Sequence, residues 1–200
     1  MQNTTKGKPG AIVALKITTR NAAGEIIAEE YKKDDIYLWN WAVLLAQILK
    51  LQFAPMDTTT YAYKNTAGTA KVTTATYLNG RQNRWGTSFE GMWKVQIGSG
   101  SNVPAITDYA LQTWVKEVQP TIPDLVTLGN VVKIVFSSTF SFTAETICAE
   151  TAIKATGCLS STIDAASDFI ITRDTFTPVT VPAGGTVTLQ HELWFNGTPS

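Results

Sequence analysis

The chain has few of the residues from which catalytic and metal sites are usually built. Its 200 residues include one histidine and two cysteines. The histidine, His191, lies in an alternating segment in which Glu192 is expected on the opposite face, so the two cannot form a local catalytic pair. No spacing of histidine and cysteine is typical of a zinc site, and no glycine-rich loop leads into a helix as a phosphate site would require.

These absences predict a protein with no catalytic activity, no metal and no cofactor. His191 is expected either at the surface or buried with its hydrogen bonds satisfied. A Cys–His nucleophile that uses Cys148 or Cys158 is the catalytic alternative.

Charge is also sparse. Charged residues make up 16% of the chain, and sixteen basic side chains balance sixteen acidic ones. A surface that binds nucleic acid needs a basic stripe, which the sequence does not contain. Low net charge gives little repulsion between copies, which suits a subunit that assembles.

Membrane insertion is not expected either. The first residues lack the apolar core of a signal peptide. The longest apolar stretch, 36–51, contains Asn40 and Gln47 and is too short to span a bilayer comfortably.

The two cysteines are too few for a disulfide scaffold. Cys148 and Cys158 lie ten residues apart, and the turn residues between them do not centre the pair in a regular hairpin. We therefore interpret both as structural residues, either as two buried thiols or as a disulfide.

Threonine is abundant, and β-branched residues that carry a hydroxyl fit half-exposed strands. Alternating apolar positions predict strands over eight segments, and 182–185 supplies the turn before the last of them. The predicted strands are 11–19, 25–30, 92–97, 113–119, 131–142, 146–153, 169–173 and 186–195. Strands at this spacing, with little room for crossover helices, predict a mainly β protein with a single β-sandwich domain over residues 1–200.

Three segments lie outside this pattern. Residues 36–51 have apolar positions three and four apart, which predicts one amphipathic helix. Residues 1–10 form an N-terminal arm. Residues 52–88 form an insertion, either a long excursion or an extra hairpin that folds back over the sheet.

The second half of the chain resembles a family of phage virion structural proteins. The family's features occur in the same order here: an N-terminal apolar helix by position, a Gly-Thr-Gly-like turn, a Pro-x-x-x-Asp-x-x-Leu-like stretch, an alternating Phe/Thr strand, an Ile-x-Glu segment and an Arg-x-x-Phe-x-Pro-Val segment before a glycine turn. The matching residues are Gly98 to Gly100, Pro104, Asp108, Leu111, Phe136 to Phe142, Ile147, Glu150, Arg173, Phe176, Pro178, Val179, Gly184 and Gly185.

This resemblance implies a jelly-roll-like sandwich without enzymatic activity, located in the virion. It implies self-association into a homo-oligomer and binding to other capsid or tail proteins. Two departures are visible: Ala152 replaces a glycine that follows the glutamate in the family, and the loop from Lys154 to Asp168 is long. The insertion 52–88 has no counterpart in the family pattern.

Two further predictions concern particular side chains. Arg173 lies among apolar neighbours and needs a partner if it is buried, and Glu150 on the preceding strand is the expected one. The insertion is rich in aromatic residues and arginine, which are enriched at interface hot spots. The predicted interface residues are Phe53, Tyr61, Tyr63, Arg81, Arg84 and Trp85.

A receptor-binding module is the alternative function. Aromatic faces stack on sugar rings, and Trp85 lies in a polar stretch beside two arginines. In this reading the protein binds a carbohydrate, such as a glycan on the host surface.

Overall fold

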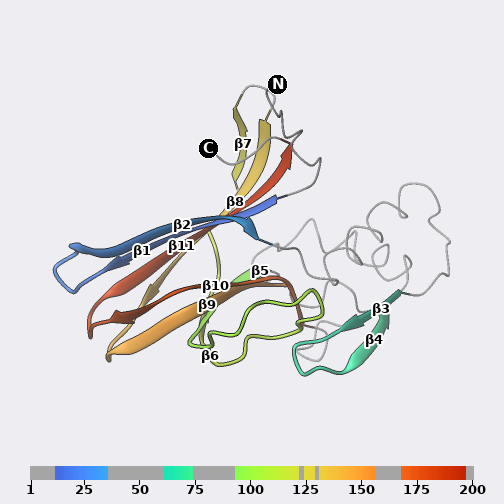
Figure 1. Ribbon diagram of the computed structural model, residues 1–200, viewed down its shortest axis with the longest axis horizontal. Helices are drawn as coiled ribbons and strands as arrows, with labels where there is room; N and C mark the ends of the chain where they lie inside the picture. Colours follow the sequence, from blue (N-terminus) through green and yellow to red (C-terminus); the bar gives the residue numbers. More distant parts are fainter. Residues whose placement is uncertain are drawn as a thin grey trace, which may run out of the picture.

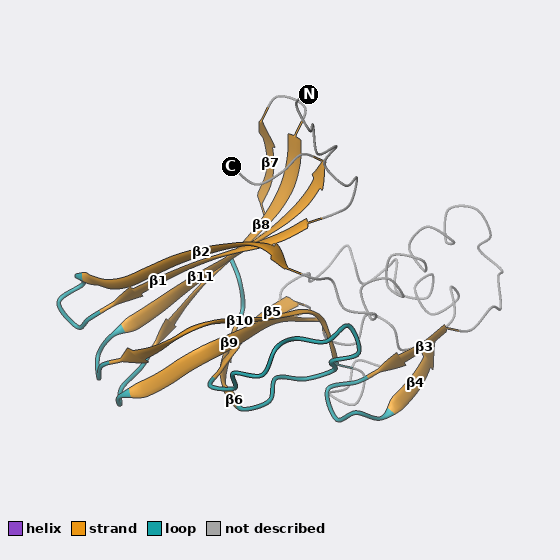
Figure 2. Ribbon diagram, in the orientation of Figure 1, coloured by secondary structure: helices purple, strands orange, loops and turns teal. Residues whose placement is uncertain are grey.

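A computed structural model describes residues 12–35, 61–73, 93–121, 124–128, 131–155 and 168–196. These residues form eleven strands and the turns between them, with no helix among them (Figure 2). The strands are β1 (Ile12–Arg20), β2 (Ile26–Asp35), β3 (Tyr61–Lys64), β4 (Ala70–Thr73), β5 (Trp93–Gly98), β6 (Trp114–Val118), β7 (Asp124–Leu128), β8 (Val131–Ser141), β9 (Thr146–Ala155), β10 (Phe169–Val181) and β11 (Thr186–Asn196).

Two antiparallel sheets face each other and form a β-sandwich. The larger sheet has the order β2-β1-β11-β8-β7, and the smaller has the order β10-β9-β5-β6. Figure 1 shows β1, β2 and β11 in one layer, with β9 and β10 in the layer below. The predicted mainly β sandwich is therefore confirmed.

One two-stranded ribbon runs through both sheets. Strands β9 and β10 pair in the smaller sheet, and their continuations β8 and β11 pair in the larger one. The chain passes between the sheets twice, at 142–145 and at 182–185. These two crossings are joined, because Phe142 N donates to Gly185 O and Gly184 N donates to Phe142 O. The hairpins β1–β2 and β5–β6 then extend the sheets on either side of the ribbon.

The second crossing depends on its glycines. Gly184 has a φ of 78°, in the left-handed region that glycine adopts without strain. A Cβ on Gly185 would lie 2.7 Å from Arg20 O, too close for any side chain. The turn predicted at 182–185 is confirmed, and these contacts give the reason for its paired glycines.

The core between the sheets consists of two clusters of side chains from their inner faces, to which β3 adds Tyr63. One contains Val13, Tyr63, Phe136, Ile153, Ala155, Phe169, Ile171 and Leu193. The other contains Leu15, Ile17, Val95, Ile97, Phe140, Phe142, Cys148, Phe176, Val181, Val187 and Leu189. Alternation along each strand places these residues inside, as the sequence pattern predicts.

The structure corrects three strand predictions. Strand β2 continues to Asp35 instead of ending at Glu30. Strand β10 continues to Val181 instead of ending at Arg173, although it contains Pro178. Its register with β9 shifts between Thr175 and Val179, so the proline is not required to donate in the ladder. Strand β7 was not expected after Pro120 and Pro123. Among the described strands it pairs with β8 alone and lies at the edge of the sheet, a position that tolerates a preceding proline.

Part of the insertion folds onto its own sandwich. Residues 61–73 form the hairpin β3–β4, and Thr66 N donates to Asp168 O at the start of β10. Tyr63 is 3% exposed, and its ring meets that of Phe169 edge-on at 5.4 Å. The prediction that Tyr63 lies at an interface between subunits is therefore wrong, because its own chain already buries the ring. For this stretch the extra hairpin, the second possibility, is correct.

Several predicted elements lie outside the described residues. These are the N-terminal arm 1–10, the amphipathic helix 36–51 and the parts of the insertion before 61 and after 73.

Replacing Tyr63 with alanine should lower the free energy of unfolding by about 3 kcal/mol, since it removes a large buried ring from the core. Chemical denaturation measures this change. Ile147→Ala is the control, because Ile147 is 55% exposed and its loss should cost less than about 0.5 kcal/mol. Equal effects from the two substitutions would show that the hairpin does not contribute to the core.

Candidate functional site

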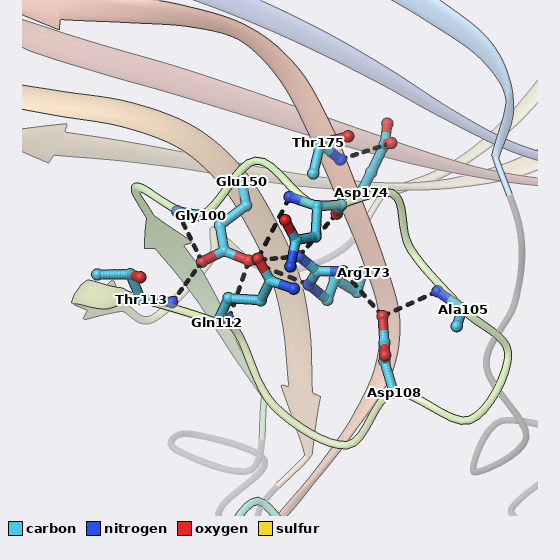
Figure 3. A network of polar contacts seen from close by, with 10 residues as sticks. Gly100, Ala105, Asp108, Gln112, Thr113, Glu150, Arg173, Asp174 and Thr175 are labelled. Atoms are coloured by element: carbon cyan, nitrogen blue, oxygen red, sulfur yellow. Dashed lines mark hydrogen bonds and ion pairs between the residues drawn. The ribbon is translucent and has the colours of Figure 1, made fainter.

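Five residues of the sequence pattern come together on the outer face of the smaller sheet: Gly98, Gly100, Asp108, Glu150 and Arg173. Arg173 and Glu150 lie on the neighbouring strands β10 and β9, and the loop 99–113 between β5 and β6 runs over them (Figure 3). Arg173 is 1% exposed and Glu150 is fully buried. The expected ion pair is present, and two nitrogens of Arg173 share one carboxylate oxygen: Nε and Nη2 donate to Oε2 of Glu150 at 3.0 and 2.9 Å.

A β-bulge directs Arg173 to this face. The register of β10 against β9 shifts between Ile170 and Thr172. Ile171 belongs to the core between the sheets, and strict alternation would place Arg173 there as well. The shift moves Arg173 opposite Ala152, whose side chain lies on the outer face with Ile170 and Leu111. Bulges commonly re-aim a side chain in this way.

Both oxygens of the Glu150 carboxylate accept hydrogen bonds. Oε1 accepts hydrogen bonds from the backbone amides of Gly100 at 3.0 Å and Thr113 at 2.8 Å. Oε2 accepts one from the amide of Gln112 at 3.1 Å, in addition to the two from Arg173. One buried carboxylate thus holds both ends of the loop.

The Gly-Ser-Gly motif makes room for this carboxylate. A Cβ on Gly98 would lie 2.5 Å from Thr113 O, and one on Gly100 would lie 2.5 Å from Oε1 of Glu150. No side chain fits at either position. The two glycines are therefore required by the close approach of the loop to Glu150, whereas the sequence indicated only a turn.

Asp108 closes the network from the middle of the loop. Its Oδ2 accepts from Nη1 of Arg173 at 2.8 Å and from Ala105 N at 2.9 Å. Nη2 of Arg173 also donates to Asn102 O at 3.1 Å. Asp108 belonged to the sequence pattern, but its pairing with Arg173 was not predicted. These two residues are far apart in the sequence, so no local sequence pattern predicts that they pair.

The loop 99–113 and the first residue of β6 expose large apolar side chains to solvent. Val103 is 86% exposed, Ile106 is 56% and Trp114, at the start of β6, is 57%. Tyr109 is 39% exposed, and its ring lies beside the turn of the β3–β4 hairpin, where a Cβ on Gly68 would be 3.0 Å from it. The network thus holds an apolar surface in a fixed shape.

The remaining predicted site residues divide into two groups. Tyr61 begins β3, but its side chain is not among those described, and Phe53, Arg81, Arg84, Trp85 and Cys158 lie outside the described residues. Cys148 is a buried free thiol in the core, and burial raises its pKa to about 11. It is therefore a structural residue, as predicted.

His191 differs from both expectations. It is 1% exposed, so it is not a surface residue. Its Nε2 lies 3.3 Å from Oγ1 of Thr151, and that hydroxyl donates to Gln96 O at 2.7 Å. Nε2 therefore carries the proton, and Nδ1 has no partner within the described chain. Burial lowers the pKa of His191 to about 3, so the side chain is neutral and out of reach of a substrate.

The described residues contain no group of three or more histidine, cysteine, aspartate or glutamate side chains that could hold a metal ion. Within the same residues, no helix is long and apolar enough to cross a membrane. Comparisons with protein-family models, with curated proteins and with solved structures give no match to this chain. The resemblance to phage virion proteins therefore rests on the sequence pattern.

Replacing Arg173 with methionine should destabilise the protein by about 4 kcal/mol, because Glu150 would remain buried without its counter-charge. Denaturant unfolding at neutral pH measures the loss. Lys16→Met is the matched control: Lys16 pairs with Glu29 at 3.0 Å, but both side chains are about half exposed, so less than about 1 kcal/mol is expected. A loss at Arg173 no larger than that of the control would contradict the structural role of this pair.

His191 should make the protein sensitive to mild acid. The unfolded imidazole takes up a proton below pH 6.5, whereas the folded one does so only near pH 3. Above pH 6.5, His191 is therefore neutral in both states and does not lower the free energy of unfolding. As the pH falls from 6.5 towards 3, protonation of the unfolded chain lowers that free energy progressively. Between pH 7 and pH 5 this group should remove about 2 kcal/mol of unfolding free energy.

The variant His191→Gln has no group that titrates in this range and keeps an N–H donor for Thr151. Its unfolding free energy should therefore fall less between pH 7 and pH 5 than that of the unmodified protein. If the unfolding free energies of the two proteins fell equally between pH 7 and pH 5, the low pKa of His191 would be refuted.

Proposed function

We propose that this protein is a structural subunit of a virus particle. It acts by binding copies of itself and other capsid or tail proteins, and it has no catalytic activity. The observation that carries the proposal is the loop 99–113, which holds exposed apolar side chains on a backbone fixed by Arg173, Glu150 and Asp108. A surface that is already ordered loses little conformational entropy on binding.

Two further observations support a virion protein. Gly98, Gly100, Asp108, Glu150 and Arg173 are spread through the sequence pattern shared with phage virion proteins, yet they meet in one network. In addition, the ribbon that passes from one sheet to the other is the kind of folded-over antiparallel pair from which jelly-roll sandwiches are built. We therefore propose a jelly-roll-like sandwich as the finer fold class.

The charged groups of the loop and of the adjoining strand β6 favour a protein partner. Asp108 is bound to Arg173, Lys116 donates to Ser141 O, and Glu117 is bound by Lys94 and Lys154. These charges are already used within the subunit, so the loop offers mainly apolar contacts. Such contacts suit the centre of an interface between protein subunits.

The double variant Ile106→Ser, Trp114→Ser should weaken self-association, because it removes two exposed apolar anchors without touching the Arg173 network. The mass measured by light scattering should fall towards that of one chain, and less of the variant should be incorporated into particles. Ile26→Ser is the control, since Ile26 is 52% exposed on the other sheet. An unmodified protein that is monomeric at all concentrations and absent from purified particles would refute the proposal, as would a double variant that assembles normally.

A further inference from the structure

A groove of about 590 Å³ lies on the outer face of the five-stranded sheet. This volume falls within the range of small-molecule sites, roughly 300–1,000 Å³. The groove extends over β2, β1, β11 and β8, away from the apolar loop on the other sheet. Its lining residues are Lys16, Glu29, Glu30, Tyr31, Lys133, Gln190, Glu192 and Trp194.

Glu192 organises the base of the groove. It is 7% exposed and accepts hydrogen bonds from three side chains. Nζ of Lys133 donates to Oε1 at 2.8 Å, and Nε1 of Trp194 and the hydroxyl of Tyr31 donate to Oε2 at 2.9 and 3.1 Å. Because Glu192 has these partners, the side chains around it are held in fixed positions before any ligand arrives.

The Tyr31 ring forms part of the floor. Tyr31 lies on β2, whereas Glu192 lies on β11, and β1 runs between these strands. To reach Glu192 the tyrosine side chain must cross β1, where Ala14, the partner of Glu192, is small enough to allow it. Tyr31 is 38% exposed, and Nζ of Lys33 lies over its ring at 5.5 Å from the centroid, so a ligand would meet the part of the ring that Lys33 leaves uncovered. Burial, followed by the nearby charge of Glu192, raises the pKa of Tyr31 to about 12, so the hydroxyl stays protonated and bound.

Gln190 supplies the unused hydrogen-bonding groups. Lys16 lies next to both Tyr31 and Gln190 in the register of the sheet, so the three side chains form one row across the outer face. Within the described chain, the side-chain amide of Gln190 makes no hydrogen bond. An amide offers two donors and one acceptor, which matches the hydroxyls of a sugar.

The groove is lined by two lysines and three glutamates, and both lysines are already paired. Lys16 pairs with Glu29 at 3.0 Å, and Lys133 pairs with Glu192 at 2.8 Å. Glu30 accepts a hydrogen bond from Thr177 N at 2.9 Å. Because both lysines among these residues are paired, the groove does not favour an anionic ligand. Its many polar groups do not suit a purely apolar ligand either.

We propose that this groove binds a neutral saccharide. One face of a sugar ring packs against Tyr31, and its hydroxyls bond to the Gln190 amide and to the exposed Lys16–Glu29 pair. Aromatic side chains pack on the apolar faces of ring systems in this way. Trp85, the residue that the sequence singled out for sugar binding, lies outside the described residues and is not part of this proposal. The proposal goes beyond the assembly function and does not depend on it.

The probe is an array of neutral oligosaccharides built from glucose, galactose, mannose and N-acetylglucosamine, with sialylated forms as a second arm. The full-length protein should retain one or more neutral glycans. Titration of a retained glycan should show affinity about fivefold weaker for Gln190→Ala and about tenfold weaker for Tyr31→Ala. Gln119→Ala and Tyr109→Ala are the matched controls and should bind as the unmodified protein does; Tyr109 is 39% exposed on the other side of the sandwich.

Gln190→Ala keeps the test decisive if Tyr31→Ala fails to fold, because the Gln190 side chain makes no bond in the described chain. Its mass by light scattering should match that of the unmodified protein, which separates sugar binding from assembly. Retention of no glycan, retention of sialylated forms alone, or unchanged affinity in Gln190→Ala would each overturn the proposal.

Discussion

The buried guanidinium of Arg173 is the constraint on which the smaller sheet depends. A charge without solvent must be matched by opposite charge and by hydrogen bonds, and Glu150, Asp108 and Asn102 O provide them. Meeting this demand fixes the path of the loop 99–113, and it explains why Gly98 and Gly100 cannot carry side chains. Loop conformation, glycine positions and the exposed apolar surface thus follow from one ion pair.

The two outer faces of the sandwich use buried carboxylates in a similar way. Glu150 gathers three backbone amides and fastens a loop, while Glu192 gathers three side-chain donors and fixes the floor of a groove. Each carboxylate sits on a strand in the middle of its sheet. This division separates the face proposed for assembly from the face proposed for ligand binding, so each can change in sequence without disturbing the other.

The sequence predicts the features that follow from local periodicity and neighbouring strands. Alternation identifies the strands, and the adjacency of β9 and β10 makes Glu150 the expected partner of Arg173. Contacts set by tertiary packing are missed: Asp108 with Arg173, Tyr63 against Phe169, and the row formed by Tyr31, Lys16 and Gln190. Strand β7 and the second half of β10 are missed because proline is read as a strand end, although edge strands tolerate it.

The pairing of β1 with β11 has a consequence for how the chain folds. These strands are the first and last of the described sequence, and their register joins Ile12 to Trp194. The hairpin β1–β2 therefore has no partner for the free edge of β1 until β11, far along the sequence, joins it. The larger sheet closes by contacts of high sequence separation, which form slowly and leave apolar strand faces exposed in the meantime. Pairing of β1 with β11 is thus the step before which the chain is most vulnerable to aggregation.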